Sequence, residues 1–202
     1  MAGKFIVLEG IDGSGKDTQF DLLKKNLKEQ GLKAAYFSYP DYGSQFGRII
    51  RNFLASKVKL GPDSQFFLFL ADITKDSRNI RELLNKNDLV ISKRYVFSSV
   101  AYQCAQGLPY DKAKLIVEML DLPKPTLTIL LHGQVKETLE RKRASRRGDV
   151  FENDLRLMEK VGGLYERMFS NSFFSERWKL FLDSGTKNSI SGEILTEVMS
   201  VV

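Results

Sequence analysis

Several residue types that define particular protein classes are scarce in this sequence. Its 202 residues include one cysteine, Cys104, and one histidine, His132. A single cysteine excludes an internal disulfide and is typical of a reducing compartment. A single histidine without a cysteine cluster does not supply the ligands of a zinc site. We therefore expect His132 to have a structural role.

The chain also lacks a long uninterrupted apolar segment. No run approaches the roughly 18 apolar residues that suggest a membrane span. The first residues, Met1 to Lys4, lead directly into an apolar run that reaches Glu9, without the pattern of a signal peptide. These absences lead us to expect a cytoplasmic protein that does not have a membrane as a partner.

The charge that is present is mostly positive. The formal net charge is +6 and the isoelectric point is near 9.3, which favours anionic partners. The densest basic run covers 141–147, where five of seven residues are arginine or lysine. No aromatic residue interleaves with them, as a platform for single-stranded nucleic acid requires. We expect phosphate-bearing small molecules rather than nucleic acid, with a solvated helix end as the alternative interpretation of this run.

Apolar runs bounded by turn residues alternate with segments of helical period, which is typical of a parallel sheet with crossover helices. The apolar content of 43% suits one sizeable core, and we find no internal repeat or long linker. We predict an α/β fold: one domain over 1–202, with a five-stranded parallel sheet flanked by about seven helices. The expected strands are Phe5–Leu8, Ala34–Phe37, Leu89–Ile91, Leu127–Leu131 and Leu180–Leu182. The expected helices are Thr18–Gln30, Phe46–Ala55, Asp63–Asn85, Asp111–Leu120, Val135–Ala144, Asn153–Phe169 and Ile190–Met199. Ligands of such sheets bind at the carboxyl ends of the strands.

A glycine-rich loop follows the first expected strand and opens the first expected helix. Strand, glycines, lysine and helix in this order are the context of the P-loop, whose backbone N–H groups and helix N-terminus bind the phosphates of a nucleoside triphosphate such as ATP. We expect Lys16 to reach the β and γ phosphates. Glycines that only form a tight turn are the alternative interpretation. The loop consists of Gly10, Ile11, Asp12, Gly13, Ser14, Gly15, Lys16, Asp17 and Thr18.

Asp17 departs from this motif, which has Ser or Thr after the lysine to bind magnesium. The hydroxyl comes one residue later, at Thr18. The helix macrodipole favours an aspartate in the first turn. Asp17 is therefore either an ordinary helix-start residue or a carboxylate ligand that replaces the hydroxyl at Mg²⁺.

Three motifs occur in order along the chain: Phe5 to Lys16, Phe66 to Ala71, and Arg94-Tyr95 with Ser98 to Gln103. Together they resemble the thymidylate kinases, a family of nucleoside monophosphate kinases, over nearly the whole length. The resemblance implies a P-loop kinase fold with a helical lid. It also implies transfer of the γ-phosphoryl group of ATP to dTMP with Mg²⁺, and, because the family is usually dimeric, a homodimer.

The resemblance assigns roles around the acceptor. It implies that Asp12 contacts the sugar 3′-hydroxyl, that Phe69 stacks on thymine, and that Arg94 holds the acceptor phosphate. A guanidinium after a strand suits a bidentate grip on phosphate. Judged from the residues alone, Phe69 could equally belong to the core.

The third motif resembles the acceptor-pocket helix of the family, which includes Ser98, Tyr102 and Gln103. An amide that offers a donor and an acceptor suits a pyrimidine edge, which we expect Gln103 to bind. Tyr102 is expected to crowd the 2′ position against ribonucleotides. On an amphipathic helix, one of these two side chains could instead face solvent.

The basic run and the residues after it resemble the mobile lid of the family, at about 141–153. Such lids close over the triphosphate and exclude water. Family members with glycine at the position of Gly13 take their catalytic arginine from the lid, where it stabilises charge on the transferring group. With Lys16 and Arg94, the expected catalytic residues therefore include Arg143, Arg146 and Arg147.

Lys93 stands where the family has an aspartate that helps to hold the metal. Together with Asp17, it turns a neutral hydroxyl and an anion into an anion and a cation. We hypothesise that the two changes are coupled. Asp17 takes over the carboxylate role, and Lys93 either pairs with it or contacts phosphate.

Two further departures concern the acceptor. Ile73 replaces an arginine that binds the thymine carbonyl, with Lys75 as a candidate substitute donor. Tyr42 stands where many members place an arginine against the acceptor phosphate, with Arg48 or Arg51 as candidate substitutes. Two alternatives follow: a kinase for another deoxynucleotide or nucleoside, and a nucleotide-binding homologue with little catalysis.

Overall fold

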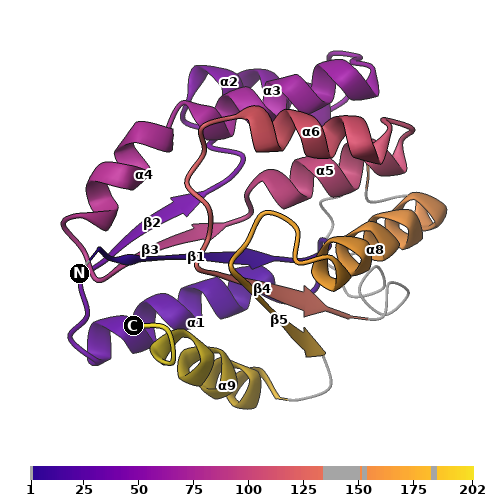
Figure 1. Cartoon of the computed structure of the whole chain (residues 1–202). Helices are drawn as coiled ribbons and strands as arrows, with labels where there is room; N and C mark the ends of the chain where they lie inside the picture. Colours follow the sequence, from indigo (N-terminus) through magenta and orange to yellow (C-terminus); the bar gives the residue numbers. More distant parts are fainter. Residues whose placement is uncertain (1, 134–150, 152–153, 183–185) are drawn as a thin grey trace.

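The computed structural model describes residues 2–133, 151, 154–182 and 186–202 (Figure 1). It has one five-stranded sheet, in the order β2-β3-β1-β4-β5, and every neighbouring pair is parallel. The predicted five-stranded parallel sheet is thus confirmed. The strands are β1 (Lys4–Glu9), β2 (Ala34–Ser38), β3 (Leu89–Lys93), β4 (Leu127–His132) and β5 (Arg177–Leu182).

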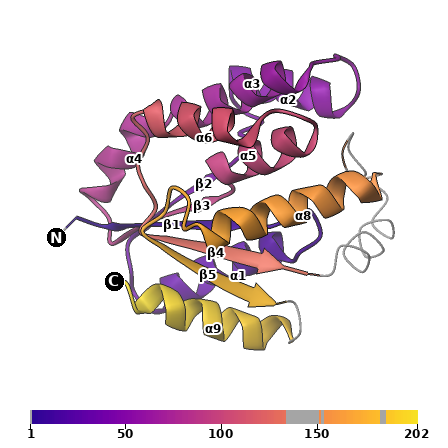
Figure 2. The ribbon, with the colours of Figure 1, turned by 45° about the vertical axis from the view of Figure 1, so that its right-hand side comes forward.

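Helices cover both faces of the sheet, eight of them within the described residues. Figures 1 and 2 show α1 and α9 against one face and the other helices on the opposite side. The helices are α1 (Lys16–Glu29), α2 (Gln45–Leu54), α3 (Pro62–Thr74), α4 (Ser77–Leu84), α5 (Val96–Ala105), α6 (Tyr110–Met119), α8 (Leu155–Ser170) and α9 (Lys187–Met199).

Strand β1 lies in the middle of the sheet and contributes to both layers of the core. Phe5 and Val7 belong to the cluster that includes α5, whereas Ile6 and Leu8 belong to the cluster with α1 and α9. Successive side chains of a strand point to opposite faces, so a strand buried on both faces reads as a continuous apolar run. This burial fixes β1 and, with it, the start of the glycine-rich loop.

The expected single helix over 63–85 is wrong, because α3 ends at Thr74 and α4 begins at Ser77. The Lys75 ammonium folds back onto the end of α3 and donates to the Asp72 carbonyl at 2.8 Å and to the Asp76 carboxylate at 2.7 Å. Asp76 also accepts from the Tyr39 hydroxyl, at 3.0 Å. These tertiary contacts stabilise a break that the helical period of the sequence does not reveal.

Amphipathic periodicity did not predict helix α5, although the family motif indicated a helix at this place in the chain. Eight of its ten residues are buried, so it has no polar stripe to give an amphipathic signal. The expected helix Val135–Ala144 lies outside the described residues. The expected lid at 141–153 does so too, except for Phe151.

Candidate active site

The glycine-rich loop joins β1 to α1 at the carboxyl edge of the sheet. Gly10, Gly13 and Gly15 have φ angles of 148°, 85° and 84°, which residues with a side chain rarely adopt. A Cβ atom on Gly10 would also lie 2.4 Å from the carbonyl oxygen of Leu131. No side chain caps the N-terminus of α1, so its first N–H groups suit an anion.

Lys16 lies under this loop with a fully buried side chain. Its Nζ donates to the Ile11 carbonyl at 3.2 Å and to Asp12 Oδ1 at 2.9 Å. Burial and the neighbouring Arg94 lower the pKa of Lys16 to about 8, although Asp12 opposes the shift. The ammonium is thus held in place by the loop that it is expected to serve.

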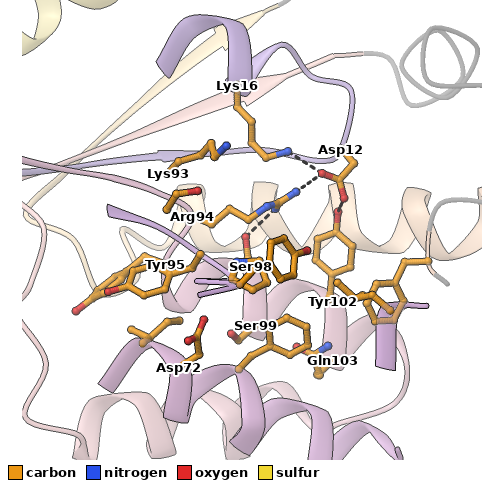
Figure 3. Close-up of a pocket in the computed structure, with 18 of the residues that line it drawn as sticks. Asp12, Lys16, Asp72, Lys93, Arg94, Tyr95, Ser98, Ser99, Tyr102 and Gln103 are labelled. Carbon is orange, nitrogen blue, oxygen red and sulfur yellow. Dashed lines mark hydrogen bonds and ion pairs between the residues drawn. The ribbon is translucent and has the colours of Figure 1, made fainter. Parts of the chain in front are cut away.

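Arg94 follows β3 and reaches across to the same loop. Its φ of 65° is unusual for a residue with a side chain. The guanidinium donates to the Gly10 carbonyl at 3.3 Å and to Ser98 Oγ at 2.9 Å, and it also pairs with Asp12. Tyr102 donates to the other oxygen of Asp12, at 3.1 Å (Figure 3). The Asp12 carboxylate therefore binds two cations, Lys16 and Arg94, and the phenol of Tyr102.

Glu9 contacts the residues next to Arg94, and the sequence did not lead us to expect a role for it. It is fully buried and accepts hydrogen bonds from the Tyr95 amide at 2.7 Å, the Ser98 hydroxyl at 2.7 Å and the Tyr165 hydroxyl at 2.9 Å. Burial raises the pKa of Glu9, while Arg94 and these donors oppose the shift. The feature of the sequence that could have identified Glu9 is its position as an acidic residue at the end of an apolar strand.

Lys93 and Asp17 form an ion pair beside the loop. Lys93 Nζ lies 2.5 Å from Asp17 Oδ1, and the Asp17 side chain is 68% exposed. Partial desolvation by the neighbouring residues disfavours the charge of Asp17, yet the hydrogen bond from Lys93 and the charge of Lys16 outweigh it and lower the pKa of Asp17. Of the two roles expected for Lys93, the structure has the pairing with Asp17.

A cavity of about 360 Å³ opens between the loop and helices α3 and α5. Figure 3 shows its two ends: Lys16, Asp12 and Arg94 at one, Ser99 and Gln103 at the other. The structure brings all six expected acceptor residues to this cavity, and their roles stay predictions. The six are Asp12, Phe69, Arg94, Ser98, Tyr102 and Gln103. Phe69 packs at the margin of the core, and both Tyr102 and Gln103 are buried rather than solvent-facing.

Lys75 and Arg51, the candidate substitutes for arginines at Ile73 and Tyr42, make different contacts. Lys75 does not line the cavity; its ammonium lies 3.1 Å from Asp72 and 3.3 Å from Asp41. It therefore does not supply the donor that we expected it to provide in place of an arginine at Ile73. Arg51 donates to the Tyr42 carbonyl at 3.2 Å and stacks over the Tyr42 ring, which itself lines the cavity. Arg51 therefore lies against Tyr42, the residue that we expected it to compensate for.

The remaining expected residues lie outside the described residues or away from the cavity. Arg143, Arg146 and Arg147 are outside the described part of the chain. His132 ends β4 with its Nε2 3.3 Å from Glu166. Among the described residues, no group of three or more histidine, cysteine, aspartate or glutamate side chains could hold a metal.

Comparisons with known proteins give a consistent family. A family model described as thymidylate kinase matches residues 8–186. A probable thymidylate kinase of Pyrococcus abyssi is 38% identical over 167 residues, which cover 80% of each chain. The thymidylate kinase of Brachyspira hyodysenteriae is 34% identical and covers 98% of this chain and 94% of its own.

A solved structure supports the fold. The thymidylate kinase of Candida albicans superposes with a TM-score of 0.78, at 23% identity, over 98% of this chain and 92% of its own. The P-loop kinase fold and the family that the sequence motifs indicated are thus confirmed, and this chain belongs to the thymidylate kinase family of nucleoside monophosphate kinases.

Proposed function

We propose that this protein transfers the γ-phosphoryl group of ATP to the 5′-phosphate of dTMP, giving dTDP and ADP. The observation that carries the proposal is the two-ended cavity. Its charged end adjoins the P-loop, and its other end offers an aromatic side chain, Phe69, and a buried amide, Gln103. A nucleoside monophosphate has the same two parts, a charged phosphate and a flat base.

The charged residues account for most of the chemistry that phosphoryl transfer needs, which is positioning and charge stabilisation. Lys16 and the first turn of α1 would hold the donor phosphates, and Arg94 would hold the acceptor phosphate. Asp12 keeps both cations at the cavity before substrates arrive, through the contacts given above. In the complex, we propose that its carboxylate would accept from the sugar 3′-hydroxyl.

Magnesium suits the residues present, with Asp17 as its protein ligand. Mg²⁺ is usually bound through one or two carboxylates together with substrate phosphates, so the absence of a larger acidic group among the described residues is compatible with it. Asp17 is exposed beside Lys16, and its lowered pKa keeps it ionised at neutral pH. When bound, the ion would neutralise charge on the β and γ phosphates.

The lid, the assembly and the location complete the proposal. We assign the catalytic arginine to Arg143, Arg146 or Arg147 in the lid at 141–153, because Gly13 resembles the family members that take this arginine from the lid. A homodimer is supported by the exposed apolar side chains of Ile49 on α2, Phe67 on α3 and Met119 on α6. None of the described helices is long and apolar enough to cross a membrane. A single thiol suits the reducing cytoplasm, where we place the protein.

An ADP-release assay tests the function, with dTMP, dUMP, dGMP, dCMP and thymidine as acceptors, with and without Mg²⁺. We expect dTMP to have the highest kcat/KM and thymidine to be inactive, because it offers no phosphate to Arg94. Arg94→Gln should lower kcat/KM for dTMP by about 100-fold, since hydrogen bonds to charged groups each contribute about 1.5–3 kcal/mol. ATP binding without ADP release on any acceptor would instead identify a binding protein.

One observation favours a second acceptor as the alternative. Ile73 lines the cavity and offers no hydrogen bond to a base, and Lys75 is bound to carboxylates elsewhere. A thymine carbonyl would therefore lack the donor that the family resemblance places at this position. A kcat/KM for another deoxynucleotide above that for dTMP in the same assay would establish this alternative.

A further inference from the structure

A relay of three side-chain amides links α3 to α5 behind the uncharged end of the cavity. Gln65 Nε2 donates to the Leu60 carbonyl at 2.8 Å. Gln65 Oε1 accepts from Gln103 Nε2 at 3.3 Å and from Gln106 Nε2 at 3.0 Å. Gln65 and Gln103 are both almost fully buried. Of the three amides, the one of Gln103 belongs to the cavity wall.

The relay has a defined polarity, which begins at the backbone. The carbonyl of Leu60 can accept but not donate, so it requires the amino group of Gln65. The carbonyl of Gln65 must then face α5, where it needs donors. Gln106 is fixed in the same sense, because its Nε2 also donates to the Tyr102 carbonyl at 3.0 Å. Gln103 is consequently held with its amino group toward Gln65.

This polarity leaves the carbonyl oxygen of Gln103 as the end of the relay. Gln103 Oε1 is buried and has no hydrogen-bond partner among the described residues. A buried acceptor without a partner costs about 1–3 kcal/mol, and native proteins rarely leave one without a reason. Phe69 and Ile73 on the same wall offer no polar atom, and Ser99 adds a hydroxyl.

We propose that Gln65 is the positioning residue that sets base selectivity. By holding the Gln103 carbonyl as an acceptor, Gln65 favours a base with a ring N–H, such as N3–H of thymine or uracil. Cytosine carries a lone pair at N3, which a fixed carbonyl oxygen repels. The inference rests on the proposed function, because it concerns the acceptor of the same kinase.

The comparison of dUMP with dCMP tests the inference, because the two acceptors differ only at positions 3 and 4 of the ring. In Gln65→Met, nothing accepts from Gln103, and its amide can reverse. We expect the ratio of kcat/KM for dUMP over dCMP to fall about tenfold, the size of one neutral hydrogen bond. The KM for ATP should not change. Gln65→Glu still accepts from Gln103 and should keep the wild-type ratio.

Gln106→Leu is the matched control, since it removes the other donor to Gln65 and leaves Gln103 in place. It should keep the wild-type ratio. An unchanged ratio in a folded Gln65→Met protein would overturn the inference, and so would a fall of equal size in Gln106→Leu.

A second measurement uses the wild-type protein and does not depend on whether Gln65→Met folds. The N3-methyl analogue of dUMP keeps both ring carbonyls and has N–CH3 in place of N3–H. We expect calorimetry to find it bound at least about tenfold more weakly than dUMP, because Gln103 Oε1 stays without a donor. Equal affinities overturn the inference. Loss of turnover with every monophosphate would contradict the proposed function instead, and this binding comparison would still test whether Gln103 Oε1 accepts from the base, on which the role of Gln65 depends.

Discussion

Asp17 and Lys93 form an ion pair where the sequence resemblance leads us to expect a hydroxyl and a carboxylate. We predict that Lys93→Asp lowers kcat by at least about tenfold, because it replaces the ion pair with two carboxylates that repel each other. Adding Asp17→Ser to Lys93→Asp should recover most of the loss, since it restores the usual pair. Steady-state kinetics of both single variants and the double variant give the coupling energy.

The surface pair Lys112 and Asp63 is the matched control for this cycle. Its ions are 2.9 Å apart and both side chains are more than half exposed, so Lys112→Asp should leave kcat within about twofold, as exposed pairs contribute little. If Lys93→Asp alone were as active as the double variant, Asp17 and Lys93 would not be coupled.

Cys104 provides a pH-dependent prediction at the residue scale. Burial raises the pKa of its thiol to about 11. Only the thiolate reacts, so at pH 8 iodoacetamide should modify Cys104 roughly 100-fold more slowly than an unperturbed cysteine. The rate should rise about tenfold per pH unit through pH 10. Mass spectrometry measures it, with the urea-unfolded chain as control; a plateau near pH 9 in the folded protein would contradict the prediction.

At the scale of elements, Tyr165 of α8 joins β1 to α5 through Glu9 and Ser98, at 2.9 Å from each. We predict that Tyr165→Phe lowers the free energy of unfolding by about 1–3 kcal/mol, because Glu9 loses a donor in the interior. Urea unfolding measures the change. Tyr36→Phe, at an exposed ring, is the control and should change stability by less than about 0.5 kcal/mol.

The loss in Tyr165→Phe should also depend on pH. Burial already raises the folded-state pKa of Glu9, so Glu9 binds a proton more readily in the folded protein than in the unfolded chain. The contribution of Glu9 to the free energy of unfolding therefore falls as the pH rises above the ordinary carboxyl range. Removing a donor to the charged form raises the folded pKa further. The destabilisation should therefore be larger at pH 7.5 than at pH 5.5; the opposite order would show that Glu9 is not the group affected.

Elements with a strong local signal were predictable from the sequence. The run Phe5 to Leu8 predicted a central strand, and the glycines with Lys16 predicted the loop, because backbone geometry and phosphate binding demand those residues. Arg94, directly after a strand, was expected at the crevice for the same reason. The rest depends on tertiary contacts: Tyr165 lies 156 positions from Glu9. No local sequence pattern predicts a hydrogen-bond partner so far along the chain.

The amide relay and the break after α3 were missed for related reasons. Gln65 looks like an ordinary polar residue near a helix start, and its role appears only when α5 packs against α3. Asp72 is similar: it lies on the cavity wall, and its carboxylate accepts from the Asp41 amide and the Ser44 hydroxyl, each at 2.8 Å. Contacts of this kind become visible only when the chain is folded.

At the scale of the whole molecule, apolar side chains remain exposed on α2, α3 and α6. Ile49, Phe67 and Met119 are 47%, 53% and 77% exposed. Figures 1 and 2 show these helices in the layer farthest from the sheet. Exposed apolar side chains are common at protein interfaces, and a twofold dimer would bury the same side chains on both copies.

Phe67→Glu tests this homodimer. We predict that the wild-type chain sediments as a dimer at micromolar concentration and that Phe67→Glu sediments as a monomer, because two buried carboxylates without partners oppose association. The substitution is at an exposed site, so the folded chain should keep its far-UV circular dichroism. Leu182→Glu, at a residue 59% exposed on the outer strand β5, is the matched control and should stay dimeric. A monomeric wild-type protein would contradict the homodimer, and loss of the dimer in both variants would place the interface elsewhere.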